Sequence, residues 1–235
     1  MAFPFSDFLD LGQTDHGELF TAAPDQPVWS ALGRLAEHLD RRLDAAATIS
    51  DLIQGEVHER AVVGPRVWIA EGAVVEANAV IQGPAWIGRG TVVRSGAYLR
   101  QTVIAGNGCV LGNSSEFKNC LLFNDCEVPH FNYVGDSILG HKAHLGAGVI
   151  CSNVRLDRQN VRVRDAEGDS IDTGLRKFGA IVGDRTEVGC NSVLSPGTLL
   201  GRDGLVYPGT HWRGVLPDAH IARHPQPLEV FPKAG

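Results

Sequence analysis

The chain has 235 residues, of which 43% are hydrophobic and 28 are glycine, and its formal net charge at pH 7 is −6. The basic residues form no long run, which argues against nucleic acid as a main partner, because phosphate neutralisation needs clustered Lys and Arg. No run of about 18 apolar residues is present, so neither a membrane span nor a membrane partner is expected. The N-terminus lacks the basic region of a signal peptide. We therefore expect a cytoplasmic protein.

Residues 1–58 are predicted to form an N-terminal extension. Residues 1–27 are irregular but carry several Phe and Leu side chains, which predict packing against another surface, with a neighbouring subunit as one candidate. From residue 28 to 47 apolar residues recur at helical spacing, and Pro27 suits the first turn of a helix. This predicts one amphipathic helix that covers the open end of the domain that follows. A partner-binding helix is the alternative.

From Val63 onward an apolar residue recurs at every sixth position. A period of six is neither helical nor that of a plain alternating strand. It is typical of a solenoid in which each hexad is a short strand plus a turn, and three hexads close one triangular coil. Ten of the eleven residues at the repeated position are large and apolar, and the eleventh is Ala: Val63, Ile69, Val75, Ile81, Ile87, Val93, Leu99, Ala105, Leu111, Phe117 and Phe123. The pattern resembles the left-handed β-helix of hexapeptide-repeat acyltransferases, which implies an all-β fold, a left-handed parallel β-helix with a short N-terminal helical segment.

Trp68 and Trp86 are separated by three hexads, which is one full coil, so they are predicted to stack on adjacent coils. The phase breaks after Phe123, and residues 128–136 are expected to be irregular. Hexads return at Leu139 and continue to Cys151.

A charged insert at 154–180 follows, with a predicted hairpin formed by residues 161–164 and 167–169. The β-helix domain is expected to span 59–210, and a Pro-rich extended tail to occupy 211–235. The chain has five cysteines, and no two are separated by one full coil of three hexads: Cys109, Cys120, Cys126, Cys151 and Cys190. We predict free thiols in a reducing compartment that fill small spaces in the coil interior.

Two features are candidates for chemistry. Arg100 and Lys118 are also one full coil apart, so their charges should stack on one face, where they repel each other unless an anion sits between them. Two separate surface cations are the alternative. His130 lies in the break of the repeat, near this cationic pair, where it is either a structural or surface residue or part of a functional site.

An ordered set of motifs makes the resemblance more specific. The runs Glu116–Asn119, Pro129–Asp136, Leu145–Gly148 and Cys151–Asn153 resemble the acetyltransferase half of the bifunctional N-acetylglucosamine-1-phosphate uridylyltransferase/glucosamine-1-phosphate acetyltransferase, over residues 60–210. The resemblance implies that His130 is the general base and that Glu116 orients it. It also implies a sugar-phosphate site made by Arg100, Lys118, Tyr133, His144, Asn153 and Lys177. Ala147 and Cys190 would line an acetyl-CoA groove between subunits of a homotrimer.

Three departures from that family stand out. His144 replaces the usual Asn at a sugar contact, so the identity of the amino sugar or nucleotide sugar stays open. Cys190 replaces a small hydroxyl residue at the coenzyme contact. The nucleotidyltransferase half is missing, so uridylyl transfer and its Mg²⁺ site are not expected, and a separate partner for that step stays open.

The predicted function is acetyl-CoA-dependent N-acetylation of an amino-sugar phosphate similar to glucosamine 1-phosphate, in nucleotide-sugar and cell-envelope synthesis. His130 would take the proton of the attacking amine, a backbone N–H of the turn 146–148 would stabilise the oxyanion, and no metal is expected. One alternative is a non-catalytic or regulatory subunit that binds a sugar phosphate or nucleotide sugar. The other is a zinc hydrolyase that uses His130, His141 and His144.

Overall fold

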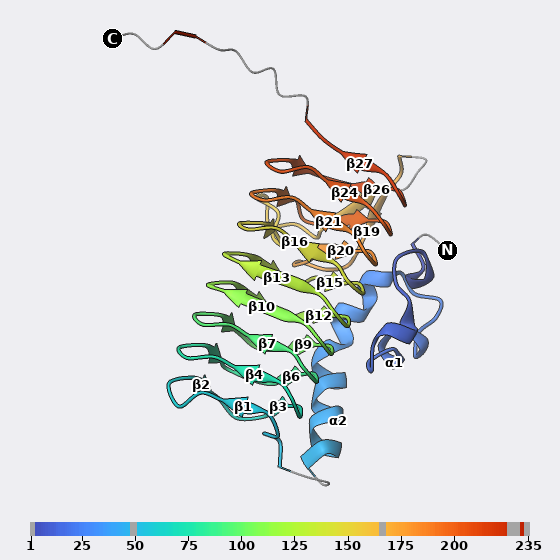
Figure 1. Ribbon diagram of the computed structural model, residues 1–235. Helices are drawn as coiled ribbons and strands as arrows, with labels where there is room; N and C mark the ends of the chain where they lie inside the picture. Colours follow the sequence, from blue (N-terminus) through green and yellow to red (C-terminus); the bar gives the residue numbers. More distant parts are fainter. Residues whose placement is uncertain (1–2, 48–50, 165–167, 225–230, 233–235) are drawn as a thin grey trace.

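The computed structural model describes residues 3–47, 51–164, 168–224 and 231–232. From Glu56 the chain winds into a parallel β-helix whose coils stack along one axis, which confirms the predicted left-handed β-helix (Figure 1). Each coil crosses three sheets in the same order, and parallel strands of neighbouring coils pair within each sheet. In the described part of the chain, no helix is long and apolar enough to cross a membrane.

The strands are distributed over the three sheets as follows. The first sheet holds β1 (Glu56–Val57), β4 (Val74–Val75), β7 (Val92–Val93), β10 (Val110–Asn113), β13 (Glu127–His130), β16 (His144–Leu145), β21 (Glu187–Val188), β24 (Leu205–Val206) and β27 (Ile221–Ala222). The second holds β2 (Val62–Val63), β5 (Val80–Ile81), β8 (Tyr98–Leu99), β11 (Glu116–Lys118), β14 (Tyr133–Gly135), β17 (Ile150–Cys151), β22 (Val193–Leu194) and β25 (His211–Trp212). The third holds β3 (Val67–Ile69), β6 (Ala85–Ile87), β9 (Val103–Ala105), β12 (Cys120–Leu122), β15 (Ile138–Leu139), β20 (Ala180–Val182), β23 (Thr198–Leu200) and β26 (Val215–Leu216).

The repeated apolar residues fill the interior of the coils. Leu99 pairs with Phe117, and Phe117 with Val134, so each inward side chain packs on its counterpart in the next coil. Full burial of one such side chain contributes about 1.5–3 kcal/mol relative to exposure. The hexad phase from Val63 to Phe117 is therefore confirmed as the core pattern.

The five cysteines are free thiols, as predicted, and four of them are buried. Burial raises the pKa of Cys151 to about 12, so its thiol stays protonated and unreactive at neutral pH. Cys190 differs, because it is exposed rather than a filler of the interior.

The length of a coil changes at one corner only, the corner between the second and third sheets, which we call the variable corner. At the other two corners the inward residue recurs after six residues in every described coil. At the variable corner the spacing is six in the early coils, as from Leu99 to Ala105, but five from Phe117 to Leu122. It is six again from Leu194 to Leu200 and four from Trp212 to Leu216 in the last coil.

The shortened corner corrects two expectations. Leu122, not Phe123, points into the coil, because the missing residue shifts the phase by one. Phe123 instead packs outside the coil against the N-terminal segment. The stretch 128–136 is also regular rather than irregular, since β13 and β14 pair with strands of both neighbouring coils.

The insert also leaves from the variable corner, where Val182 follows Cys151 only after the whole insert instead of after a single hexad. The predicted hairpin is confirmed as β18 (Arg162–Arg164) paired antiparallel with β19 (Ser170–Asp172). Residue 167 of the expected turn lies outside the described residues. The expected end of the coils at residue 210 is wrong, because β25, β26 and β27 pair with the preceding coils. Because the spacing at the variable corner of this last coil is four residues, a search for a six-residue repeat does not detect the coil.

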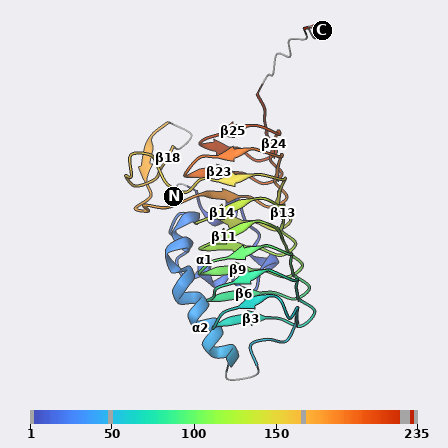
Figure 2. The ribbon, with the colours of Figure 1, turned by 90° about the vertical axis from the view of Figure 1, so that its left-hand side faces the viewer.

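The N-terminal segment consists of η1 (Phe5–Asp7), η2 (Leu11–Gln13), α1 (Glu18–Thr21), η3 (Val28–Arg34) and α2 (Leu35–Ala47). The predicted helix is present, but its first seven residues are the 3₁₀ turn η3. Figure 1 and Figure 2 show α2 beside the stack of coils, along the third sheet, rather than over the end of the first coil. The expected capping role is therefore wrong. The N-terminal segment packs on the outward side chains of its own third sheet.

The predicted stack of Trp68 on Trp86 is confirmed, with ring centroids 5.0 Å apart. The guanidinium of Arg42, on α2, lies 5.1 Å from the centroid of the Trp86 ring. A cation over an indole face is favourable. The two indoles therefore form a packing ridge under α2.

The stability of the folded chain is expected to depend on pH through a buried histidine of the N-terminal segment. His16 is buried, with its Nδ1 2.8 Å from Nε2 of His38, and burial, followed by the charges of His38 and Arg42, lowers the pKa of His16 to about 3. The unfolded chain binds this proton below pH 6.5 and the folded chain does not, so stability falls as the pH drops from 6.5 towards 3. Between pH 7 and pH 5 the loss from His16 should be about 2 kcal/mol.

Urea unfolding at both pH values checks this, with His16→Gln as the comparison. The variant should lose less stability between pH 7 and pH 5 than the wild type. Equal losses in the two proteins would show that His16 is not responsible.

Candidate functional site

The structure places the predicted site residues, apart from His144, at the two edges of the second sheet. One edge is the corner between the first and second sheets, where His130 ends β13. The Gly148 N–H donates to the His130 carbonyl at 3.0 Å, and the Asn191 N–H donates to the Ala147 carbonyl at 2.8 Å. His130, Ala147 and Cys190 therefore lie on three successive coils in one column, which we call the His130 column.

A buried asparagine fixes the turn after His130. Asn132 Oδ1 accepts from the His130 N–H at 3.0 Å, and its Nδ2 donates to the Gly146 carbonyl at 2.7 Å. Its own N–H donates to Ser115 Oγ at 3.1 Å. Asn132 thus ties together three coils around an imidazole that is itself exposed and accepts or donates no hydrogen bond within the described residues.

The other edge is the variable corner, where a carboxylate that the sequence analysis did not single out is the centre of a network. The Asp136 side chain is 4% exposed and lies 2.9 Å from Lys118 Nζ. Asn119 Nδ2 donates to Asp136 Oδ1 at 2.9 Å, and Asn153 Nδ2 donates to Oδ2 at 2.5 Å. Asn153 also donates to the Tyr133 hydroxyl at 3.2 Å. We call these five residues the Asp136 cluster.

Burial, with the Asp136 charge as the second cause, raises the pKa of Tyr133 above its usual value, so the phenol stays protonated at neutral pH. Two donors besides the lysine contact the carboxylate, so its burial does not leave its oxygen atoms without hydrogen-bond partners. The cluster therefore holds Lys118, Tyr133 and Asn153 in fixed positions at the variable corner.

The predicted cations are each balanced by a carboxylate of this chain. Arg100 and Lys118 lie on adjacent coils, since the Arg100 N–H donates to the Phe117 carbonyl at 2.8 Å. Arg100 Nη1 contacts Glu116 Oε1 at 3.0 Å, while Lys118 is held by Asp136. Glu116 thus binds Arg100 rather than His130 in the described chain.

The two remaining sugar-contact candidates lie apart. Lys177 is exposed at the end of the insert, where the next residue, Phe178, donates its N–H to the Asn153 carbonyl at 3.0 Å. His144 lies on the first sheet, with Nδ1 2.6 Å from Glu187 Oε2. Lys177 therefore belongs to the variable corner and His144 does not.

The three histidines of the zinc alternative do not converge. His141 Nδ1 lies 2.9 Å from the Asn124 carbonyl oxygen, His144 contacts Glu187, and the His130 imidazole has no hydrogen-bonded partner among the described residues. Within residues 3–47, 51–164, 168–224 and 231–232, no group of three His, Cys, Asp or Glu side chains could hold a metal ion.

Comparisons with known proteins agree with the motifs. Residues 81–168 match the family model described as the GMPPB C-terminal domain. The bifunctional protein GlmU of Methanococcus maripaludis strain S2 is 38% identical over 178 residues, which cover 76% of this chain and 43% of that protein. The GlmU protein of Methanocaldococcus jannaschii is 35% identical over 173 residues, covering 74% of this chain and 42% of that protein.

Among solved structures, the acetyltransferase domain of PglB from Neisseria gonorrhoeae, in complex with acetyl coenzyme A, has 16% identity and a TM-score of 0.32, covering 81% of this chain and 64% of that one. The chain spans less than half the length of the two GlmU proteins. By its coils and its sequence, the chain is a hexapeptide-repeat β-helix protein similar to the acetyltransferase region of the bifunctional GlmU proteins.

Proposed function

We propose that the protein is a cytoplasmic acetyl-CoA-dependent N-acetyltransferase that acts on an amino-sugar phosphate similar to glucosamine 1-phosphate. The observation that carries the proposal is the His130 column. It presents an unpaired imidazole one coil below Ala147, whose N–H has no protein acceptor in the described part of the chain. The similarity to GlmU proteins over three quarters of the chain supports the same reaction class.

His130 would act as the general base. An amine attacks a thioester carbonyl only when it carries a lone pair, so the base takes the proton as the C–N bond forms. The resulting oxyanion needs a donor, and the Ala147 N–H is the available one in this column. The C–S bond then breaks, the proton goes to the departing coenzyme thiolate, and the amide remains.

The Asp136 cluster, together with Arg100 and Lys177, would bind the sugar phosphate. Asp136 positions Lys118 and Asn153 and touches no substrate itself. Because His144 is held by Glu187 on the first sheet, the expected sugar contact at this position would differ from that of an asparagine.

The site would be completed in a homotrimer. In one protomer, His130 precedes β14 and Asp136 follows it, and the His130 imidazole makes no hydrogen bond to the Asp136 cluster within the described residues. A rotationally symmetric trimer brings different surfaces of two subunits together at each interface. We infer that the base comes from one subunit and the phosphate-binding residues from its neighbour.

Co-expression of two inactive variants checks this inference. His130→Ala and Lys118→Ala should each be inactive alone, but trimers assembled at random from equal amounts of both should together recover about a quarter of the wild-type activity. About three quarters of these trimers are mixed, and one of the three interfaces in each mixed trimer has both intact halves. Separately purified variants that are mixed without subunit exchange provide the control. No recovery in mixed trimers would show that both halves belong to one subunit.

The proposed function is tested by following release of the coenzyme A thiol with a panel of amino-sugar 1-phosphates. Turnover with glucosamine 1-phosphate supports the proposal as stated. Turnover with a different amino sugar supports the proposed reaction but identifies another acceptor than glucosamine 1-phosphate. A folded protein that acetylates none of the acceptors would favour the non-catalytic alternative.

A further inference from the structure

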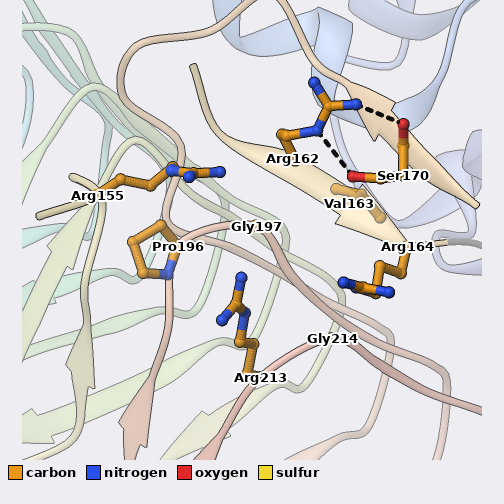
Figure 3. Close-up of a pocket in the computed structure, with 9 residues that line it drawn as sticks. All are labelled: Arg155, Arg162, Val163, Arg164, Ser170, Pro196, Gly197, Arg213 and Gly214. Carbon is orange, nitrogen blue, oxygen red and sulfur yellow. Dashed lines mark hydrogen bonds between the residues drawn. The ribbon is translucent and has the colours of Figure 1, made fainter. Parts of the chain in front are cut away.

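A second cationic region lies beyond the Asp136 cluster, where the insert meets the last coils. A cavity of about 420 Å³ lies between the hairpin β18–β19 and the variable corner. Figure 3 shows the residues that line it. Four arginines line it, and no acidic residue of the described chain does: Arg155, Arg162, Arg164 and Arg213. Pro196, Gly197 and Gly214 of the coils form its floor.

The sequence of β18 explains why two of these arginines share a face. Val161-Arg162-Val163-Arg164 alternates apolar and basic residues, and alternate residues of a strand point to opposite sides. Val161 and Val163 are buried in the cluster that includes the N-terminal segment. Arg162 and Arg164 therefore point away from that cluster, and the hairpin that carries them is anchored by a packed apolar face.

Ionic contacts within the protein leave part of this charge unbalanced. Arg155 pairs with Asp157, with Nε 2.9 Å from Oδ1, and Arg162 Nη1 lies 3.7 Å from Asp172 Oδ2. Arg162 also donates to the Ser170 side chain and backbone. Within the described residues, Arg164 donates to the Gly168 carbonyl at 3.4 Å, and Arg213 has no ionic or hydrogen-bonded partner. Two positive charges therefore converge on the cavity with no carboxylate in its described lining.

A second cavity of about 480 Å³ continues from the first and shares Arg155, Arg162, Pro196 and Arg213 with it. Its other walls combine apolar side chains, including the fully exposed Leu156, with the carboxylate of Asp157, which pairs with Arg155, and with a polar pair, Ser195 Oγ and His211 Nε2, 3.0 Å apart. One end of the combined groove thus suits a doubly charged anion, and the other suits a flat heterocycle with polar edges.

We propose that this groove, the arginine groove, binds the nucleoside diphosphate part of a ligand. Guanidinium groups match phosphate oxygens in a bidentate manner, so Arg164 and Arg213 would hold the diphosphate. Apolar and hydrogen-bonding groups of the second cavity would hold the nucleoside. A sugar nucleotide and coenzyme A both contain such a moiety. This proposal concerns only the binding of the diphosphate ligand and does not depend on the proposed acetyl transfer.

The test is isothermal titration of the full chain with pyrophosphate, UDP and coenzyme A at fixed ionic strength. We expect Arg213→Ala to weaken binding of pyrophosphate and of at least one nucleotide about tenfold or more, as for loss of a hydrogen-bonded charge. Arg164→Ala should act in the same direction. Arg158→Ala is the matched control, because Arg158 is an exposed arginine of the same insert that does not line either cavity.

Each outcome bears on the proposal. Loss of UDP affinity in Arg213→Ala identifies a sugar nucleotide as the source of the diphosphate, and loss of coenzyme A affinity identifies the coenzyme. Unchanged affinities in Arg213→Ala would overturn the proposal, as would equal weakening by Arg158→Ala, which indicates general charge attraction. Absence of binding by all three probes to the wild type would also overturn it. Matching urea midpoints of the variants and the wild type exclude unfolding as the cause.

Discussion

Replacement of His130 by alanine is expected to lower kcat for coenzyme A release about 10²–10⁴-fold, the usual contribution of a general base. The side chain is exposed and forms no hydrogen bond within the described residues, so its removal leaves no buried group unpaired. The free energy of unfolding should therefore change by less than about 0.5 kcal/mol. Initial rates at saturating substrate measure the effect.

The matched control for this variant is His224→Ala, which removes an exposed histidine that follows the last coil. Its kcat should equal that of the wild type. If His130→Ala kept more than a tenth of the wild-type kcat, another group would have to accept the proton. If both histidine variants lost activity equally, the effect would not be specific to His130.

Replacement of Asp136 by asparagine is expected to destabilise the fold by about 3–5 kcal/mol, the cost of breaking a buried ion pair by removing one partner. The change leaves the Lys118 ammonium, which is 22% exposed, without its counter-charge. Asparagine is the appropriate replacement, because Asp136 has φ 48° and asparagine tolerates this left-handed conformation better than alanine. Urea unfolding at pH 7 measures the change in stability.

An exposed ion pair provides the control for Asp136. Asp203 contacts Arg185 at 2.7 Å but is 52% exposed, so Asp203→Asn should cost less than about 1 kcal/mol. The double variant Asp136→Asn/Lys118→Met should recover part of the stability lost in Asp136→Asn, since it removes both charges. Equal costs for Asp136→Asn and Asp203→Asn would show that the Asp136 cluster is no more than a surface contact.

The interior of the coils could be predicted from sequence because every inward residue has the same partners, one coil below and one coil above. That regularity makes Leu99 and Phe117 equivalent, so the period appears directly in the sequence. The shortened corners could not be predicted in the same way. Corners of both lengths contain a residue with positive φ, such as Asn119 at 47° in a shortened corner and Thr102 at 61° in a six-residue corner, so this conformation does not mark the change of length. A hexad count treats the shift as loss of the repeat.

The position of the N-terminal segment was not predicted, although the sequence contains a signal for it. Strands of the third sheet such as β9 and β12 are buried at all three positions, whereas strands of the second sheet such as β8 alternate. Continuous apolar runs are typical of strands that are covered on both faces. Val103–Ala105 and Cys120–Leu122 therefore mark the face that α2 and its neighbours cover.

The site was predicted unevenly for a related reason. His130 and Asn153 belong to motifs that can be matched one by one, whereas Asp136 acts through contacts with residues 17 or 18 positions away. Only the coil geometry brings these side chains together. The sequence around Gly135-Asp136 does not indicate that three donors surround the Asp136 carboxylate.

The variable corner has a practical consequence for protein engineering. It has lost one residue at Phe117–Leu122 and accommodates a long insert after Cys151, while the inward columns keep their register on both sides. The entropic cost of a longer loop rises only slowly with its length. A foreign peptide grafted between Arg213 and Gly214, where a Cβ on the glycine meets no atom within 4 Å, would be displayed on a rigid rod at a chosen height along its axis.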